Sequence, residues 1–215
     1  MKAARSCLLC VTVVFVVIAV LCHVIALATS SWLKSSDDRV INFLEIGLWQ
    51  ACFDRYLHTH ETPHRTYDGC HELGSNYYAS IRDWLVPGWL VSCQVLAVIA
   101  LLLQIVGLVF VLLLLLWVLC RWICCNGKDD PCERILLYAT PIIWIVTGMF
   151  LMMTVMIFAD NAFRLQCKDY WLEGGEPNAN HLSYSWGFEI AACIFSFISG
   201  GLLIWVVVLK GREKF

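Results

Sequence analysis

Long uncharged stretches alternate with short charged segments along the chain. The uncharged stretches cover residues 6–33, 84–120, 135–159 and 190–209, the last preceded closely by Glu189. A hydrocarbon core of about 30 Å needs about 20 apolar residues in a helix. The pattern therefore predicts a single four-span membrane domain over 1–215, with spans at about 7–28, 88–119, 135–159 and 186–209.

The ends of two spans carry polar or helix-breaking residues. The second stretch exceeds the thickness of the membrane, and Pro87-Gly88 marks the expected helix start because a missing N–H is tolerated there. Glu189 lies within a turn of the outer end of the fourth span. We expect its side chain to reach the headgroup region by snorkelling.

The composition excludes several classes of protein. The 215 residues are 60% hydrophobic and 15% charged, which fits neither a disordered chain nor a coiled coil nor a soluble α/β enzyme. A formal net charge of −2 gives no reason to expect a nucleic-acid partner. Membrane lipid is the expected surrounding partner.

The distribution of Lys and Arg predicts the orientation. Both termini and a loop at about 120–134 carry Lys2, Arg5, Arg121, Lys128, Arg134, Lys210, Arg212 and Lys214. Positive charge collects on the cytosolic side of membrane proteins. We therefore expect both termini in the cytosol and two loops outside, at about 30–83 and 160–185.

The large outer loop is predicted to be an ordered ectodomain. It is too aromatic for a flexible tether and too short for a self-sufficient core. It contains Cys52 and Cys70, and a cysteine pair in a secretory-pathway ectodomain becomes a disulfide. Closing such a loop contributes about 3 kcal/mol in the chain-entropy model.

A small antiparallel sheet is the expected fold of this loop. The β-branched and aromatic run Val40–Phe53 predicts a strand that ends at Cys52, and the run Tyr77–Ile81 leads back into the membrane. Between the cysteines, Thr62-Pro63 and Asp68-Gly69 have turn chemistry. The expected fold class is an all-α membrane four-helix bundle with this sheet resting on its helix ends.

Several residues of the loop form a familiar signature. Trp32, Gly47-Leu48-Trp49, Cys52 and Cys70 resemble the W, GLW, C, C pattern of the claudin, PMP22 and calcium-channel gamma superfamily. The resemblance covers the whole chain and includes Arg82 at the end of the large loop.

The resemblance can be narrowed to a subfamily. The spacing between the two cysteines, followed by Tyr77-Tyr78, Ile81-Arg82-Asp83 and Pro87-Gly88, is most similar to the arthropod septate-junction claudins.

The resemblance implies a function as well as a fold. It implies a structural protein at lateral cell–cell junctions of the plasma membrane, of septate or tight type, which assembles with itself and other claudin-like proteins in cis and in trans to form a paracellular diffusion barrier. Trp32 and Trp49 are rings suited to the membrane interface, and the signature residues are expected to be structural, with no catalytic role and no cofactor. The alternatives are an auxiliary subunit of an ion channel or receptor and a growth- or myelin-associated protein.

The charges of the large loop bear on selectivity. The loop carries five Lys or Arg and eight Asp or Glu, so residual permeability is expected to favour cations modestly. Asp54 and Glu72 flank the cysteine pair and are the first candidate charge sites.

His60-Glu61-Thr62-Pro63-His64 matches the HExxH pattern of zinc proteases. That pattern needs a regular helix, and Pro63 disfavours one, so no catalytic or metal site is expected. Metal binding by His58, His60 and His64 is a weaker alternative to a polar hairpin tip.

Other cysteines and the C-terminus suggest further chemistry. Cys120, Cys124 and Cys125 follow the second span where reversible palmitoylation occurs, although reduced thiols fit equally well. Cys167 is a third outward cysteine, either free or bonded to another chain. The C-terminal Phe215 has Glu213 two places before it, which disfavours binding to a PDZ scaffold.

Overall fold

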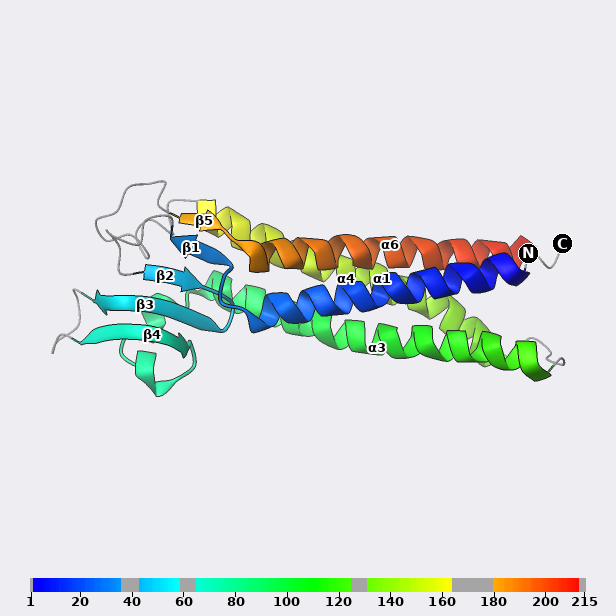
Figure 1. Cartoon of the computed structure of the whole chain (residues 1–215), viewed down its shortest axis with the longest axis horizontal. Coiled ribbons are helices and arrows are strands. Elements are labelled where there is room, and N and C mark those ends of the chain that lie inside the picture. The colour runs from blue at the N-terminus through cyan, green and yellow to red at the C-terminus, as the bar shows by residue number, and fades with distance from the viewer. Residues whose placement is uncertain (1, 36–42, 59–64, 125–130, 164–179, 213–215) are drawn as a thin grey trace. The chain divides into compact units, whose positions relative to one another are not determined.

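The computed structural model describes residues 2–35, 43–58, 65–124, 131–163 and 180–212 (Figure 1). Its helices are α1 Lys2–Ala28, a 3-10 turn Asn76–Tyr78, α2 Arg82–Leu85, α3 Gly88–Cys124, α4 Pro131–Phe163 and α6 Tyr184–Arg212. Its strands are β1 Leu33–Ser35, β2 Phe43–Ile46, β3 Gln50–Leu57, β4 Thr66–Glu72 and β5 Asn180–Leu182.

Four of the helices contain segments long and apolar enough to cross a membrane. The segments are Arg5–Ala28, Gly88–Val118, Glu133–Ala162 and Tyr184–Arg212. The prediction that the second of these helices starts near Pro87-Gly88 is confirmed, since α3 begins at Gly88. The chain divides into two compact units.

The first unit is Met1–His23, Val98–Leu151 and Ala191–Phe215, and its described residues are all helical. Among its described side chains, Trp144 of α4 is the largest that is fully buried, and an added Cβ on Gly107 of α3 would lie 2.9 Å from the Trp144 Nε1. A Cβ on Gly200 of α6 would lie 2.8 Å from Cγ1 of Ile145. The two glycines therefore allow α3 and α6 to approach α4 closely.

Several polar side chains inside this unit have partners, although the Gln104 amide and the Trp144 Nε1 are buried without a hydrogen bond. Thr147 and Ser196 donate their hydroxyls to the carbonyl oxygens four residues earlier, Ile143 and Ala192. The Lys210 Nζ lies 2.5 Å from Glu133 Oε1, and both side chains are buried. A buried charge is tolerated only when it is paired.

The second unit, Val24–Ala97 and Met152–Ile190, contains the sheet. The five strands are antiparallel in the order β4-β3-β2-β1-β5 (Figure 1). The sheet has one apolar core with the adjoining helix ends, formed by Trp32, Phe43, Ile46, Leu48, Phe53, Tyr67, Tyr78, Leu90 and Phe158 among others.

The strands differ from the prediction. The single strand expected over Val40–Phe53 is wrong: β2 ends at Ile46, the chain turns through Gly47-Leu48-Trp49, and β3 continues past Cys52 to Leu57. The turn is hard to predict from the sequence because β-branched and aromatic residues continue on both sides of it. Gly47 is the one residue there that indicates a break in the strand. Residues 40–42 and Thr62-Pro63 lie outside the described residues.

One further local expectation is wrong. Asp68-Gly69 lies inside β4, and Gly69 has a φ of +81°, a conformation that favours glycine and allows an irregularity in a strand. The run Tyr77–Ile81 is a 3-10 turn followed by a short connection to α2, because Tyr78 is buried against the sheet instead of extending it.

Glu189 does not snorkel. It is 0% exposed and shares one face of α6 with Ser185 and Ala192, which are also fully buried. Positions four and three residues apart lie on the same side of a helix. The carboxylate is therefore directed into the protein, and the expectation of a headgroup position is wrong.

Candidate functional site

The cysteine pair joins the two longest strands of the sheet. Cys52 of β3 and Cys70 of β4 are directly opposite, with their Cα atoms 4.0 Å apart, and form a disulfide. The predicted disulfide is confirmed. It fixes the hairpin from which the candidate charge sites project.

The Gly47-Leu48-Trp49 turn joins the sheet to the helix ends. Its first residue has no room for a side chain: a Cβ on Gly47 would lie 2.6 Å from the Thr29 carbonyl oxygen. Leu48 is fully buried, and its carbonyl accepts a hydrogen bond from the Gln94 amide of α3 at 2.6 Å. These contacts hold the turn against the end of α1 and against α3.

The two tryptophans of the signature have different environments. Trp32 is fully buried, donates its Nε1–H to the Ala26 carbonyl at 2.8 Å, and packs on Phe158 with ring centroids 4.9 Å apart. It belongs to the protein core, so its predicted place at the membrane interface is wrong. Trp49 is 39% exposed, as an interfacial ring requires.

Glu45 is a connecting residue that sequence reasoning missed. Its carboxylate accepts hydrogen bonds from the hydroxyls of Ser30 and Ser31. It therefore ties β2 to the segment between α1 and β1. The only signal in the sequence is an acidic residue inside an apolar strand.

The β3-β4 hairpin packs on Tyr67 and Tyr78, whose structural role the sequence does not indicate. The Tyr78 hydroxyl donates to the Ala51 carbonyl at 2.9 Å, and the Tyr67 and Ser80 hydroxyls are 2.7 Å apart. Burial, with a smaller contribution from Tyr77, raises the pKa of Tyr78 to about 12. Tyr78 thus remains a neutral hydrogen-bond donor at physiological pH.

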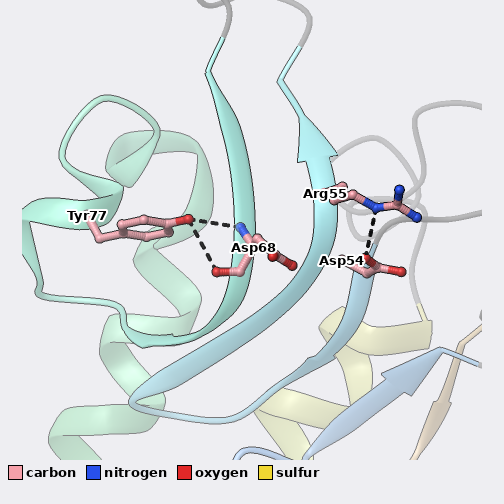
Figure 2. A network of polar contacts seen from close by, with 4 residues as sticks. All are labelled: Asp54, Arg55, Asp68 and Tyr77. Carbon is pink, nitrogen blue, oxygen red and sulfur yellow. Dashed lines mark hydrogen bonds and ion pairs between the residues drawn. The ribbon is translucent and has the colours of Figure 1, made fainter.

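Tyr77 covers part of the outer edge of β4. Figure 2 shows its hydroxyl against the backbone of Asp68, accepting from the amide at 2.9 Å and donating to the carbonyl at 3.2 Å. The Asp68 carboxylate points away from this contact. An edge strand is a template for pairing with another chain, and these bonds occupy two of its groups.

The predicted charge sites lie at different places. Asp54 pairs with the neighbouring Arg55 at 3.3 Å, with both side chains at least half exposed (Figure 2). Asp54 lies in the middle of β3, whereas Glu72 lies at the open end of the hairpin, opposite Gln50. Arg82 donates to the carbonyls of Gly74 and Ser75 at 3.0 and 2.9 Å, so it holds the turn that follows Glu72.

The remaining candidates are only partly described. Cys120 has an exposed thiol, whereas the Cys124 side chain, Cys125 and Cys167 lie outside the described residues. His58 is buried, with its ring centroid 5.0 Å from that of Trp84, and His60, Glu61 and His64 lie outside the described residues. Within the described ranges, no His, Cys, Asp and Glu side chains group in a way that would hold a metal ion.

One comparison decides the family. The model of the PMP-22/EMP/MP20/Claudin tight junction family matches residues 17–205, which include the disulfide, the Gly47-Leu48-Trp49 turn, the second half of the first membrane segment and most of the other three. The chain belongs to this family. Claudin-family proteins are non-enzymatic structural membrane proteins, in agreement with the prediction that this chain is not an enzyme. A comparison with curated proteins finds no match.

Proposed function

We propose that this claudin-family protein is a structural component of septate or tight cell–cell junctions, where it limits paracellular diffusion by assembling within one membrane and with the opposite cell. The observation that carries the proposal is the disulfide-bonded β3-β4 hairpin seated on the helix ends by the Gly47-Leu48-Trp49 turn. A rigid, charged hairpin suits contact between proteins better than a flexible loop does.

The proposal includes an orientation and a subtype. The sheet faces the intercellular space, and both termini lie in the cytosol, as the distribution of Lys and Arg favours. The block from Tyr77 to Gly88 supports assignment to the arthropod septate-junction type.

The test is depletion of the protein from a polarised epithelium that expresses it. Tracer flux between the cells is expected to rise, and the full-length chain is expected to restore the barrier from a lateral junctional belt. The matched control is a Cys52→Ser, Cys70→Ser double variant at equal total expression. It is expected to restore neither the barrier nor the lateral junctional belt. Unchanged tracer flux after depletion would contradict the barrier function. Location in synaptic or intracellular clusters with a large channel would favour an auxiliary subunit.

Ion selectivity is tested separately in the same epithelium. Reversing both candidate charges with Asp54→Lys and Glu72→Lys is expected to reduce the preference for cations, because fixed negative charge attracts them. If selectivity does not change, the protein forms a barrier without a charge-selective path through these residues.

A further inference from the structure

A small cavity lies where the end of α1 meets the sheet. It has a volume of about 160 Å³ and is lined by Leu27, Ala28, Thr29, Trp49, Gln50 and Glu72. These residues come from three places in the chain: the end of α1, the start of β3 and the end of β4. All of them belong to the second unit.

The lining combines an anion with an aromatic ring. Glu72 supplies a carboxylate, and Trp49 supplies an indole that is 39% exposed. No cation pairs with the Glu72 carboxylate in the part of the chain that the structure describes. A carboxylate beside an accessible tryptophan is the arrangement that attracts alkylammonium groups.

The position of the cavity at the end of a membrane segment indicates where the alkylammonium group comes from. Leu27 and Ala28 are the last residues of the membrane segment Arg5–Ala28, so the cavity opens at the level of lipid headgroups. We propose that the cavity binds the ammonium group of a zwitterionic membrane lipid, with phosphocholine as the headgroup that fits best. Glu72 neutralises the charge, Trp49 contacts the methyl groups, and Leu27 borders the acyl chains.

This inference changes the role of Glu72. At the edge of the membrane its charge is directed to a lipid, whereas Asp54 projects from the middle of β3. The lipid would also hold the Gly47-Leu48-Trp49 turn against the bilayer.

The test is native mass spectrometry of the purified full chain with an equimolar mixture of phosphatidylcholine and phosphatidylglycerol of identical acyl chains. The chain is expected to retain phosphatidylcholine in preference. Glu72→Gln and Trp49→Leu are each expected to lower phosphatidylcholine retention about three- to tenfold and to leave phosphatidylglycerol unchanged.

Two controls separate a site from a general effect. Asp68→Asn removes the same charge from the same strand outside the cavity, and its lipid retention is expected to equal that of the wild type. Each variant is compared at an intact disulfide and a similar melting temperature. Tetramethylammonium chloride, which requires no variant, is expected to displace phosphatidylcholine at concentrations where sodium chloride does not.

Three outcomes would overturn the proposal. Equal retention of both lipids by the wild type excludes headgroup selection. An equal loss in Asp68→Asn and Glu72→Gln makes the effect one of net charge. If Glu72→Gln weakens self-association without changing lipid retention, the cavity takes a basic side chain from a second copy.

Discussion

Backbone atoms of Thr29 and Ser30 occupy the space where a side chain at Gly47 would lie. A Cβ added there would lie 2.6 Å from the Thr29 carbonyl oxygen and 2.8 Å from the Ser30 Cα, both backbone atoms with little freedom to move. Any other residue must therefore push the turn away from the end of α1. The signature glycine is explained by packing.

Gly47→Ala is expected to destabilise the protein by about 2 kcal/mol, because overpacking of this kind displaces backbone. Gly74→Ala is the matched control, since a Cβ at Gly74 meets no atom within 4 Å. Melting temperatures of the purified variants in detergent give the comparison. Equal melting temperatures would show that the turn tolerates a side chain.

Tyr78 makes stability depend on alkaline pH. The folded protein raises its pKa from near 10 to about 12, so the folded state holds the phenolic proton more tightly than the unfolded chain does. The resulting stability is fully present below about pH 10 and is lost as pH rises towards about 12, by up to about 3 kcal/mol.

Tyr78→Phe is accordingly expected to melt at a lower temperature than the wild type at neutral pH, having lost the hydrogen bond to Ala51. Its melting temperature is also expected to fall less steeply between about pH 10 and about pH 12. Thermal melting followed by circular dichroism measures both. Parallel pH profiles for the two proteins would assign the alkaline loss to other groups.

At the scale of elements, α4 and α6 meet through a glycine pair whose two members are not equivalent. A Cβ on Gly200 would lie 2.8 Å from Ile145 Cγ1 and 3.5 Å from the Pro141 carbonyl oxygen, whereas one on Gly201 meets nothing within 4 Å. Only the first glycine is needed for the close approach of the helices.

Gly200→Ala is therefore expected to lower the free energy of unfolding by about 1–3 kcal/mol. Gly201→Ala is expected to leave it unchanged or raise it slightly, since alanine is the better helix former. Because Gly200 and Gly201 are adjacent in the chain, the difference between the melting temperatures of the two variants reports the contact between α4 and α6. Equal destabilisation would point instead to a general loss of helix flexibility.

The elements show which features a sequence pattern reveals. Helices are set by long apolar stretches, and the Cys52–Cys70 disulfide follows from two cysteines in one loop, so both are predictable. Strand limits depend on single residues such as Gly47, which follows the end of β2, and Gly69, whose positive φ lies inside β4 where the sequence is typical of a turn. β5 is three residues long and pairs with β1 from far away in the chain, which no local pattern reports.

The burial of a side chain is harder to predict than the helix or strand in which its residue lies. Glu189 and Trp32 were both expected near the membrane surface from their amphipathic chemistry, and both are fully buried. Burial depends on which helix face or turn meets another element, and that is settled by the tertiary fold. The lipid-facing cavity shares this property, since Thr29, Trp49 and Glu72 meet only in the folded chain.

At the scale of the whole molecule, the proposed function depends on which side of the membrane the sheet faces. Thr66 at the start of β4 and Gly211 near the end of α6 are both exposed positions for a reporter cysteine. In a background that keeps only Cys52 and Cys70, with the other ten cysteines replaced by serine, Thr66→Cys is expected to react with an impermeant maleimide on intact cells. Gly211→Cys is expected to react only after permeabilisation. The reverse pattern would contradict the proposed junctional role.

The strand order also has a consequence for biosynthesis. β1 pairs on one side with β2 and on the other with β5, and the Ser183 amide donates to the Trp32 carbonyl at 3.0 Å. β5 immediately precedes α6, so a ribosome delivers it after nearly all of the chain has been made. Until then one side of β1 carries unpaired backbone groups. A nascent chain that stalls before β5 would therefore keep an open edge at β1, and the sheet can be completed only once synthesis has passed Leu182.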